Sequence, residues 1–147
     1  SKNLIDSIFD HVNNNKPLLG ICIGMQILFS KSEEGRKKGL CLLEGDVKKF
    51  DKNKNKNLPI PHNGWAMVNW LERGNKFSSK EKYLNRYYFS HSYYVNPNDK
   101  IDILAKTNYG IEFPCFIQKD NIMGVQFHPE KSNFSGKNFF KSLKNLL

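Results

Sequence analysis

The stretch PLLGICIGMQILF, Pro17–Phe29, decides the fold, because it passes from a buried-type strand to helical spacing within a few residues. Its first part, LLGICI, is apolar and is bounded by Pro17 and Gly24, which predicts a buried strand. The continuation GMQILFSKSEE, residues 24–34, places Met25, Leu28 and Phe29 on one helix face, so we predict a helix there.

The residues before this stretch also predict a helix. NLIDSIFDHVNNNK has apolar residues at helical spacing, so one face should pack inward, and the asparagine-rich end and Pro17 should terminate it. Helix, buried strand and helix in succession indicate an α/β protein. The apolar positions are Leu4, Ile5, Ile8, Phe9 and Val12.

The rest of the chain predicts mainly strands and shows no domain boundary. A further amphipathic helix should close it at GKNFFKSLKNLL, residues 136–147. The predicted strands are 40–50, 61–70 and 86–95, followed by three short strands within 102–130 that turn at 108–110 and 119–121.

Composition limits the possible functions. A chain of 147 residues is the size of one domain, and it has no apolar run of the about 18 residues that span a membrane. Much of its net charge of +9 lies in KKFDKNKNKN, residues 48–57, which we interpret as a solvated loop rather than a nucleic-acid site. The three cysteines form neither a disulfide pattern nor a zinc motif, which favours the cytoplasm.

One cysteine stands between two glycines at the predicted strand-to-helix junction, in the order Gly20-Ile21-Cys22-Ile23-Gly24. A nucleophile on such a turn projects toward a substrate, and the crowded turn needs small residues two positions away on both sides. We therefore predict that Cys22 is a nucleophile, that the following helix favours its thiolate, and that the Ile23 N–H stabilises an oxyanion. The alternative is an ordinary buried cysteine.

A candidate base lies in GVQFHPEKS. His128 and Glu130 are two positions apart, so both should point to the same side of an extended backbone, with Pro129 holding His128 extended. We predict that His128 is the general base for Cys22 and that Glu130 orients its ring. The alternative is a surface His-Pro-Glu turn.

The other cysteines and histidines are expected to be structural, and we expect no metal site and no cofactor. We place Cys41 and Cys115 in the core, His62 in a turn, His91 in the core or in a functional motif, and His11 on a surface helix.

Three segments together resemble a known family. PLLGICIGMQ, SHSYY and FHPEKS, in this order and spacing, resemble the class I (triad-type) glutamine amidotransferases. GICIGMQILFSKSEEG, GLCLLEGDVKKF, PHNGW and YYFSHSYY are similar to the glutaminase subunits of imidazole glycerol phosphate synthase, and this similarity covers nearly the whole chain. The resemblance implies a three-layer α/β fold, an open mixed sheet flanked by helices and similar to flavodoxin.

The resemblance also implies a reaction and a partner. Cys22, His128 and Glu130 would hydrolyse glutamine through a γ-glutamyl thioester. Ammonia would then pass to a (β/α)₈-barrel cyclase subunit, the partner in a heterodimer of histidine biosynthesis, with no role for nucleic acid or membrane. By the same match, the substrate-binding residues are Gln26, Ser92 and Tyr93, and the interface residues are Trp65, Tyr88 and Lys131.

Two departures from the family pattern affect these expectations. Asn63 and Ala66 stand where methionine and asparagine are usual, which leaves open a partner such as a sugar-modifying synthetase of surface-glycan pathways. The chain also opens at Ser1 without the family's first strand, helix, strand and glycine-rich loop. We therefore expect residues 1–147 to be a partial amidotransferase domain that lacks N-terminal strands and is inactive or poorly folded alone.

Three other functions stay open at this stage. A stand-alone γ-glutamyl thiol hydrolase would use the same triad without a partner. A basic nucleic-acid-binding module would bind in a strongly salt-dependent way and would not need Cys22. A catalytically silent scaffold would keep only the fold.

Overall fold

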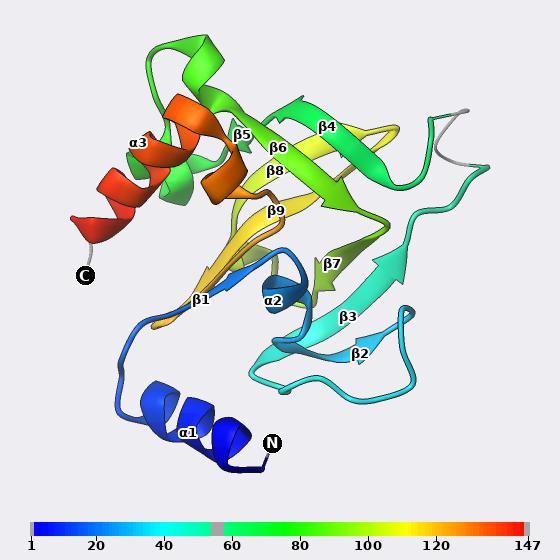
Figure 1. Cartoon of the computed structure of the whole chain (residues 1–147), viewed down its shortest axis with the longest axis vertical. Coiled ribbons are helices and arrows are strands. Elements are labelled where there is room, and N and C mark those ends of the chain that lie inside the picture. Colours follow the sequence, from blue (N-terminus) through cyan, green and yellow to red (C-terminus); the bar gives the residue numbers. More distant parts are fainter. Residues whose placement is uncertain (1, 54–57, 146–147) are drawn as a thin grey trace.

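The computed structural model describes residues 2–53 and 58–145. Helices are few and short, and strands make up more of the described chain than helices do (Figure 1). The helices are α1 (Lys2–Asn13), α2 (Ile23–Gln26) and α3 (Asn133–Lys144), and the 3₁₀ turns are η1 (Glu72–Phe77), η2 (Lys82–Asn85), η3 (Lys100–Asp102) and η4 (Pro129–Lys131). The strands are β1 (Leu18–Ile21), β2 (Phe29–Ser32), β3 (Leu43–Lys49), β4 (His62–Met67), β5 (Asn69–Trp70), β6 (Arg86–His91), β7 (Tyr93–Pro97), β8 (Ile103–Tyr109), β9 (Ile111–Lys119) and β10 (Ile122–Val125).

The described strands form three sheets. The central sheet has the order β1-β10-β9-β8-β5, in which β1 pairs in parallel with β10 and the other neighbours are antiparallel. A second sheet has the order β2-β3-β7, and β4 pairs with β6 in a two-stranded ribbon that crosses above the central sheet in Figure 1. The predicted α/β architecture of a mixed sheet with flanking helices is confirmed, but its strands are divided among three sheets.

The central sheet separates two hydrophobic clusters, because successive residues of a strand point to opposite faces. Phe116 of β9 packs against Phe139 of α3 with ring centroids 5.6 Å apart. Its neighbour Ile117 belongs to the cluster that contains Met25 of α2 and Val47 of β3. Each face of the sheet is thus covered, and α2 is anchored beside the carboxyl end of β1 (Figure 1).

The helix predicted over residues 24–34 is wrong beyond its first turn. The helix α2 ends at Gln26, and residues 29–32 form β2, which pairs in parallel with β3. Leu28 and Phe29 are buried. A short apolar run of this kind is compatible with a strand as well as with the predicted helix. The strand predicted at 86–95 is two strands, because Ser92 interrupts it between β6 and β7.

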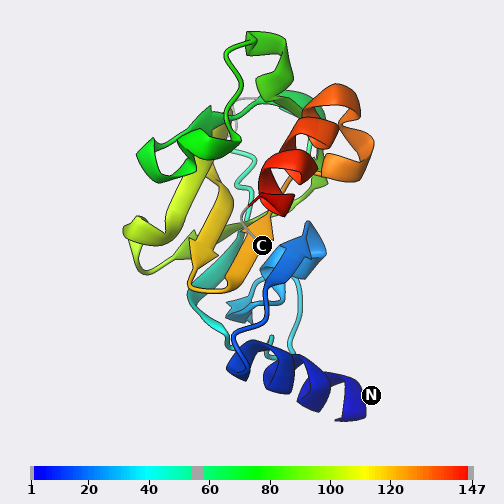
Figure 2. The same ribbon diagram turned by 90° about the vertical axis from the view of Figure 1, so that its left-hand side faces the viewer.

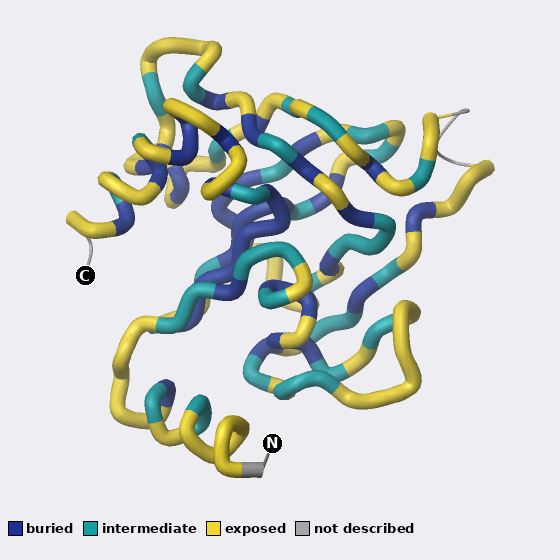
Figure 3. Tube along the Cα trace, in the orientation of Figure 1, coloured by how far each residue is buried: buried dark blue, intermediate teal, exposed yellow. Residues whose placement is uncertain are grey.

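The two terminal helices differ in how far they are buried. In α1, Val12 is buried and Ile8 and Phe9 are partly buried, so this end of the apolar face packs inward as predicted. Leu4 is 66% and Ile5 45% exposed, so the prediction is wrong at the start of the helix. Figure 2 shows α1 at one end of the molecule, and Figure 3 shows its mostly exposed surface. The apolar face predicted for the last helix consists of Phe139, Phe140, Leu143, Leu146 and Leu147. In α3, Phe139 and Leu143 are buried as predicted, but Phe140 is 39% exposed. Leu146 and Leu147 lie outside the described residues.

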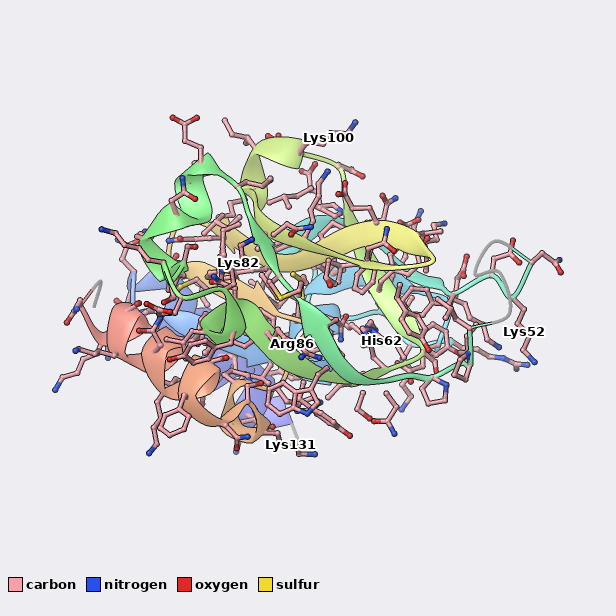
Figure 4. All side chains as sticks on the ribbon, turned by 90° about the horizontal axis from the view of Figure 1, so that it is seen from above. Lys52, His62, Lys82, Arg86, Lys100 and Lys131 are labelled. Carbon is pink, nitrogen blue, oxygen red and sulfur yellow. The ribbon has the colours of Figure 1, made fainter. Side chains whose placement is uncertain are left out.

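The basic segment 48–57 is a loop only in part. Lys48 and Lys49 belong to β3, and Phe50 is buried against His91 and Tyr94. Residues 51–53 are exposed, and residues 54–57 lie outside the described chain. Seen from above, the labelled Lys52, Lys82, Lys100 and Lys131 lie at different sides of the molecule, which spreads the positive charge (Figure 4). No helix in the described ranges has the length and hydropathy to cross a membrane.

Candidate active site

Cys22 occupies a strained turn between β1 and α2. Its backbone φ is 54° and ψ is −110°, a conformation that residues with a side chain rarely adopt. The Cys22 N–H donates to the Val125 carbonyl of β10 at 2.8 Å, which fixes the turn to the neighbouring strand. The turn therefore projects the thiol from the carboxyl end of β1, as predicted for a nucleophile elbow.

The two glycines that flank Cys22 have different surroundings. A Cβ on Gly20 would lie 2.4 Å from the Gly24 carbonyl oxygen and 2.7 Å from the Met25 nitrogen, so the predicted crowding is confirmed there. A Cβ on Gly24 would meet no described atom within 4 Å, so crowding does not explain this glycine. A further glycine, Gly124 of β10, leaves room for Met25, because a Cβ would lie 2.6 Å from its Cγ.

The Cys22 thiol is half-buried, and burial raises its pKa. The Ile23 backbone N–H and the Gln126 side chain lower the pKa, while the carboxylates of Glu130 and Glu34 raise it. The expectation that the following helix would favour the thiolate is therefore not met in this structure. Desolvation outweighs the donors, and α2 is a single turn, too short for a strong dipole.

His128 is held by a set of short hydrogen bonds. Its Nδ1–H donates to Glu130 Oε1 at 2.6 Å, and its backbone N–H donates to the Tyr88 carbonyl at 2.8 Å. Pro129 and Glu130 lie in η4, so Glu130 reaches back across a 3₁₀ turn rather than along an extended strand. The contact predicted between His128 and Glu130 is present, although it arises from a different backbone geometry.

Ser132 fixes the backbone around His128. Its hydroxyl donates to the His128 carbonyl at 2.6 Å and accepts the Tyr88 N–H at 3.0 Å, and the side chain is fully buried. Ser132 was not predicted, because a serine just after a His-Pro-Glu segment has no distinctive sequence signal.

The Cys22 sulfur and the backbone of His128 both contact strand β6. The Cys22 thiol donates to the Ser90 carbonyl at 3.7 Å, while His128 is bound to the Tyr88 carbonyl two residues earlier. Residues two apart in a strand are about 7 Å from each other. The two candidate groups also follow β1 and β10, which are adjacent and parallel and so end at the same edge of the sheet. Here the thiol donates to a carbonyl rather than to the His128 ring.

Gln26 and Tyr93, two of the predicted substrate-binding residues, contact each other, and Ser92 precedes Tyr93 in the turn after β6. Gln26 is 5% exposed, and its Nε2 donates to the Tyr93 carbonyl at 2.9 Å. The Ser92 carbonyl accepts the Phe50 N–H at 3.1 Å, which anchors the turn between β6 and β7. A cavity of about 300 Å³ opens next to Ile23 and Gln26, and its lining also includes Glu34, Lys37 and Lys38. These charged residues were missed, because in the sequence they read as an exposed helix end.

The predicted interface residues lie on the ribbon of β4 and β6 and just after His128. Trp65 is 41% exposed and packs edge-on against Tyr88, with ring centroids 6.1 Å apart. The Tyr88 hydroxyl donates to Asn63 Oδ1 at 2.6 Å, so the unusual Asn63 contacts a predicted interface residue directly. Lys131 is exposed, and Figure 4 shows it at the edge of the molecule near α3.

Only some of the other histidines and cysteines lie where the sequence predicted them. His62 lies in β4 rather than in a turn, and its Nδ1 is 3.2 Å from Nε2 of the buried His91. Cys115 is buried as predicted, but Cys41 is exposed, so the core position predicted for it is wrong. Nε2 of His11, in α1, lies 3.0 Å from the Pro17 carbonyl oxygen. The described residues contain no group of three or more His, Cys, Asp or Glu side chains that could hold a metal ion.

Comparison with known proteins agrees with this geometry. A model of the family described as glutamine amidotransferase class-I matches residues 1–144. The chain therefore belongs to the class-I glutamine amidotransferase family. Its solved neighbours share the fold: PurLQS from Thermotoga maritima superposes with a TM-score of 0.63 at 18% identity, covering 97% of this chain and 68% of that one. A glutamine amidotransferase from the same organism superposes with a TM-score of 0.56 at 18% identity, covering 99% of this chain and 54% of that one.

The curated relatives at higher identity carry a more specific name. The chain is 44% identical over 143 residues to the imidazole glycerol phosphate synthase subunit HisH of Leptospira borgpetersenii, which covers 96% of this chain and 70% of that protein. It is 44% identical over 145 residues to the protein of the same name from Methanocaldococcus jannaschii, covering 98% of this chain and 71% of that one. The chain thus spans about 70% of the length of these relatives.

Proposed function

We propose that this chain is the glutaminase subunit of an imidazole glycerol phosphate synthase, and that it forms part of one glutamine amidotransferase domain. It hydrolyses glutamine to glutamate and ammonia in histidine biosynthesis. The observation that carries the proposal is that the Cys22 thiol and the His128 backbone N–H donate to carbonyls only two residues apart in β6, those of Ser90 and Tyr88. Relatives that carry the name of this subunit, with 44% identity, support it.

The chemistry begins with proton transfer from Cys22 to His128. The sulfur attacks the side-chain carboxamide of glutamine, and His128 gives the proton to the leaving ammonia, which leaves a γ-glutamyl thioester. His128 then removes a proton from water, and the hydroxide releases glutamate and restores the thiol. Glu130 holds the ring through its 2.6 Å contact with Nδ1, which leaves Nε2 for these transfers.

We assign substrate binding to the cavity next to Ile23. The Ile23 N–H, which contacts the Cys22 sulfur, serves as an oxyanion donor. Gln26 contacts the bound glutamine, the backbone around Ser92 and Tyr93 holds its amino-acid end, and the Glu34 carboxylate suits its ammonium group.

A (β/α)₈-barrel cyclase is the proposed partner in a heterodimer, with Trp65, Tyr88 and Lys131 at the contact. Trp65 and Lys131 are exposed, and Tyr88 is adjacent to His128 in space, so a partner bound there would lie close to the base. We place the reaction in the cytoplasm, in keeping with three free cysteines.

The proposal is tested with the full-length protein and a candidate cyclase from the same genome. We expect the cyclase with its phosphorylated substrate to stimulate glutamate release about tenfold or more, with one imidazole glycerol phosphate formed per glutamate. Cys22→Ser should abolish both products, and the exposed Cys41→Ser is the matched control. Hydrolysis at an unchanged rate without any partner would instead indicate a stand-alone hydrolase, and stimulation only by a sugar-modifying synthetase would move the ammonia to surface-glycan synthesis.

A further inference from the structure

Two buried side-chain amides connect β7 with the nucleophile. Gln126 is fully buried and Gln26 is 5% exposed. Gln26 Nε2 donates to the Tyr93 carbonyl at 2.9 Å and to Gln126 Oε1 at 3.1 Å, and Gln126 Nε2 donates to Cys22 Sγ at 3.7 Å. Because a buried amide that lacks partners is costly, this chain of bonds is a constraint on both side chains.

The direction of these bonds is set by a backbone group. The Tyr93 carbonyl can only accept, so the NH₂ end of Gln26 must face it. The same NH₂ group then requires an acceptor on Gln126, which turns Oε1 of Gln126 toward Gln26 and its NH₂ toward the sulfur. A reversed Gln126 would place two donors against each other and an oxygen against a thiolate.

The backbone holds Gln126 in the same place. Its N–H donates to the Cys115 carbonyl at 2.9 Å, and the preceding residue, Val125, accepts the Cys22 N–H. Gln126 is therefore fixed to β9 by its own main chain and to the elbow through its neighbour. The side-chain amide of Gln126 therefore cannot turn away from the sulfur without breaking its hydrogen bonds to Gln26 and to Cys22.

We infer that Gln126 is a further catalytic residue, whose amide donates to the reacting sulfur of Cys22, and that Gln26 is the positioning residue that holds this amide in the donating orientation. A donor at this point stabilises negative charge on sulfur, because the N–H dipole points its positive end at it. This opposes the burial that disfavours the thiolate.

The hydrogen bonds from Gln26 to Gln126 and from Gln126 to Cys22 also link substrate binding with the nucleophile, and this part rests on the proposed function. Gln26 is the residue assigned to contact glutamine, and it is the direct neighbour of the amide that contacts the sulfur. Glutamine that hydrogen-bonds to Gln26 would therefore affect the Gln126 amide, which contacts the Cys22 sulfur. The donation from Gln126 to Cys22 does not depend on what the substrate is.

The test measures the reactivity of the thiol, not the enzyme activity. Gln126→Met keeps the length of the side chain but removes the donor, and Gln126→Glu places a carboxylate oxygen near the sulfur. Each variant carries Cys41→Ser to remove the other exposed thiol, and Gln118→Met on β9 is the matched control. Alkylation of Cys22 by iodoacetamide is followed by peptide mass spectrometry as the pH is varied.

We expect the alkylation midpoint of Gln126→Met to rise by about 1 pH unit, with about tenfold slower reaction near neutral pH, and Gln126→Glu to shift it further in the same direction. Gln118→Met should react like the parent. If Gln126→Met does not fold, the shift in Gln126→Glu decides the question. Midpoints that equal the parent's in a folded Gln126 variant would overturn the inference, even if glutamine hydrolysis proceeds as proposed.

Discussion

Gly20 and Gly24 occupy symmetrical positions around Cys22, yet only one of them is crowded. The missing Cβ of Gly20 leaves the space in which the Gly24 carbonyl and the Met25 nitrogen lie. Those are backbone atoms of the elbow itself, so a larger residue at position 20 must displace the turn that carries the sulfur. Gly24 faces open space in the described chain.

The first prediction follows from this difference. Gly20→Ala should lower the free energy of unfolding by about 2 kcal/mol or more, because rigid backbone atoms cannot move aside as a flexible side chain can. Gly24→Ala should change it by less than about 0.5 kcal/mol. Urea unfolding of the two variants measures both values, and equal losses would show that the elbow is not crowded at position 20.

At the same scale, the sequence indicated the candidate catalytic residues but not the residues that contact them. Cys22, His128 and Glu130 stand in short patterns whose spacing has a direct chemical meaning. Gln126 and Ser132 are polar residues in an apolar or turn segment, and only the fold shows what each of them contacts. Gln126 contacts Cys22, 104 positions away, and Ser132 contacts Tyr88, 44 positions away, which no local pattern can reveal.

At the scale of elements, a buried pair of histidines joins β4 to β6. His62 and His91 are directly opposite in the register, and the ring of His62 stacks between Phe89 and Tyr109, with centroids 4.8 and 4.0 Å away. His91 Nδ1–H donates to the Tyr93 carbonyl at 2.7 Å, so its Nε2 accepts from His62 Nδ1–H. Both rings are neutral in this arrangement, and burial lowers the pKa of His62 to about 4 and that of His91 to about 3.

This pair predicts a loss of stability in acid. Because each folded pKa is below the unfolded value of about 6.5, the unfolded chain binds more protons between these values. The stabilisation is complete above about pH 6.5 and falls as the pH drops toward 4, at about 2 kcal/mol per histidine by pH 5. His62→Gln should therefore lose about 2 kcal/mol less than the parent between pH 7 and pH 5.

Chemical unfolding at a series of pH values measures this difference in slope. His11→Gln, on α1 and outside the pair, is the control and should follow the parent. A parent and a His62→Gln variant that lose stability in parallel would show that the histidines are not held neutral by the fold.

The elements that were predicted wrongly have a common cause. Met25, Leu28 and Phe29 have the spacing of one helix face. The pairing of β2 with β3 nevertheless decides the conformation of the last part of that segment. The break at Ser92 is likewise set by its carbonyl, which accepts the Phe50 N–H from the loop after β3. In both cases a contact distant in sequence overrides a local preference. The strands from β8 to β10 were predicted correctly, because turn residues mark their ends.

At the scale of the whole molecule, the site exists because separate parts of the chain meet at one edge of the central sheet. β1 supplies the elbow, β10 leads to the His-Pro-Glu turn, and β6 supplies the Ser90 and Tyr88 carbonyls that accept from Cys22 and His128. The order of the motifs and their likeness to a family made the architecture predictable. The division into three sheets and the exposure of Leu4 and Ile5 in α1 depend on packing over the full chain and were not predicted.

The central claim is that Cys22, with His128 as its base, is the group that attacks glutamine. The most direct measurement is covalent labelling of the full-length protein, in complex with its cyclase partner, by the glutamine analogue 6-diazo-5-oxo-norleucine, read by peptide mass spectrometry. We predict one label per chain, on Cys22, and a labelling rate reduced about 100-fold or more in His128→Asn. A label on Cys41 or Cys115, or a His128→Asn variant labelled as fast as the parent, would contradict the account.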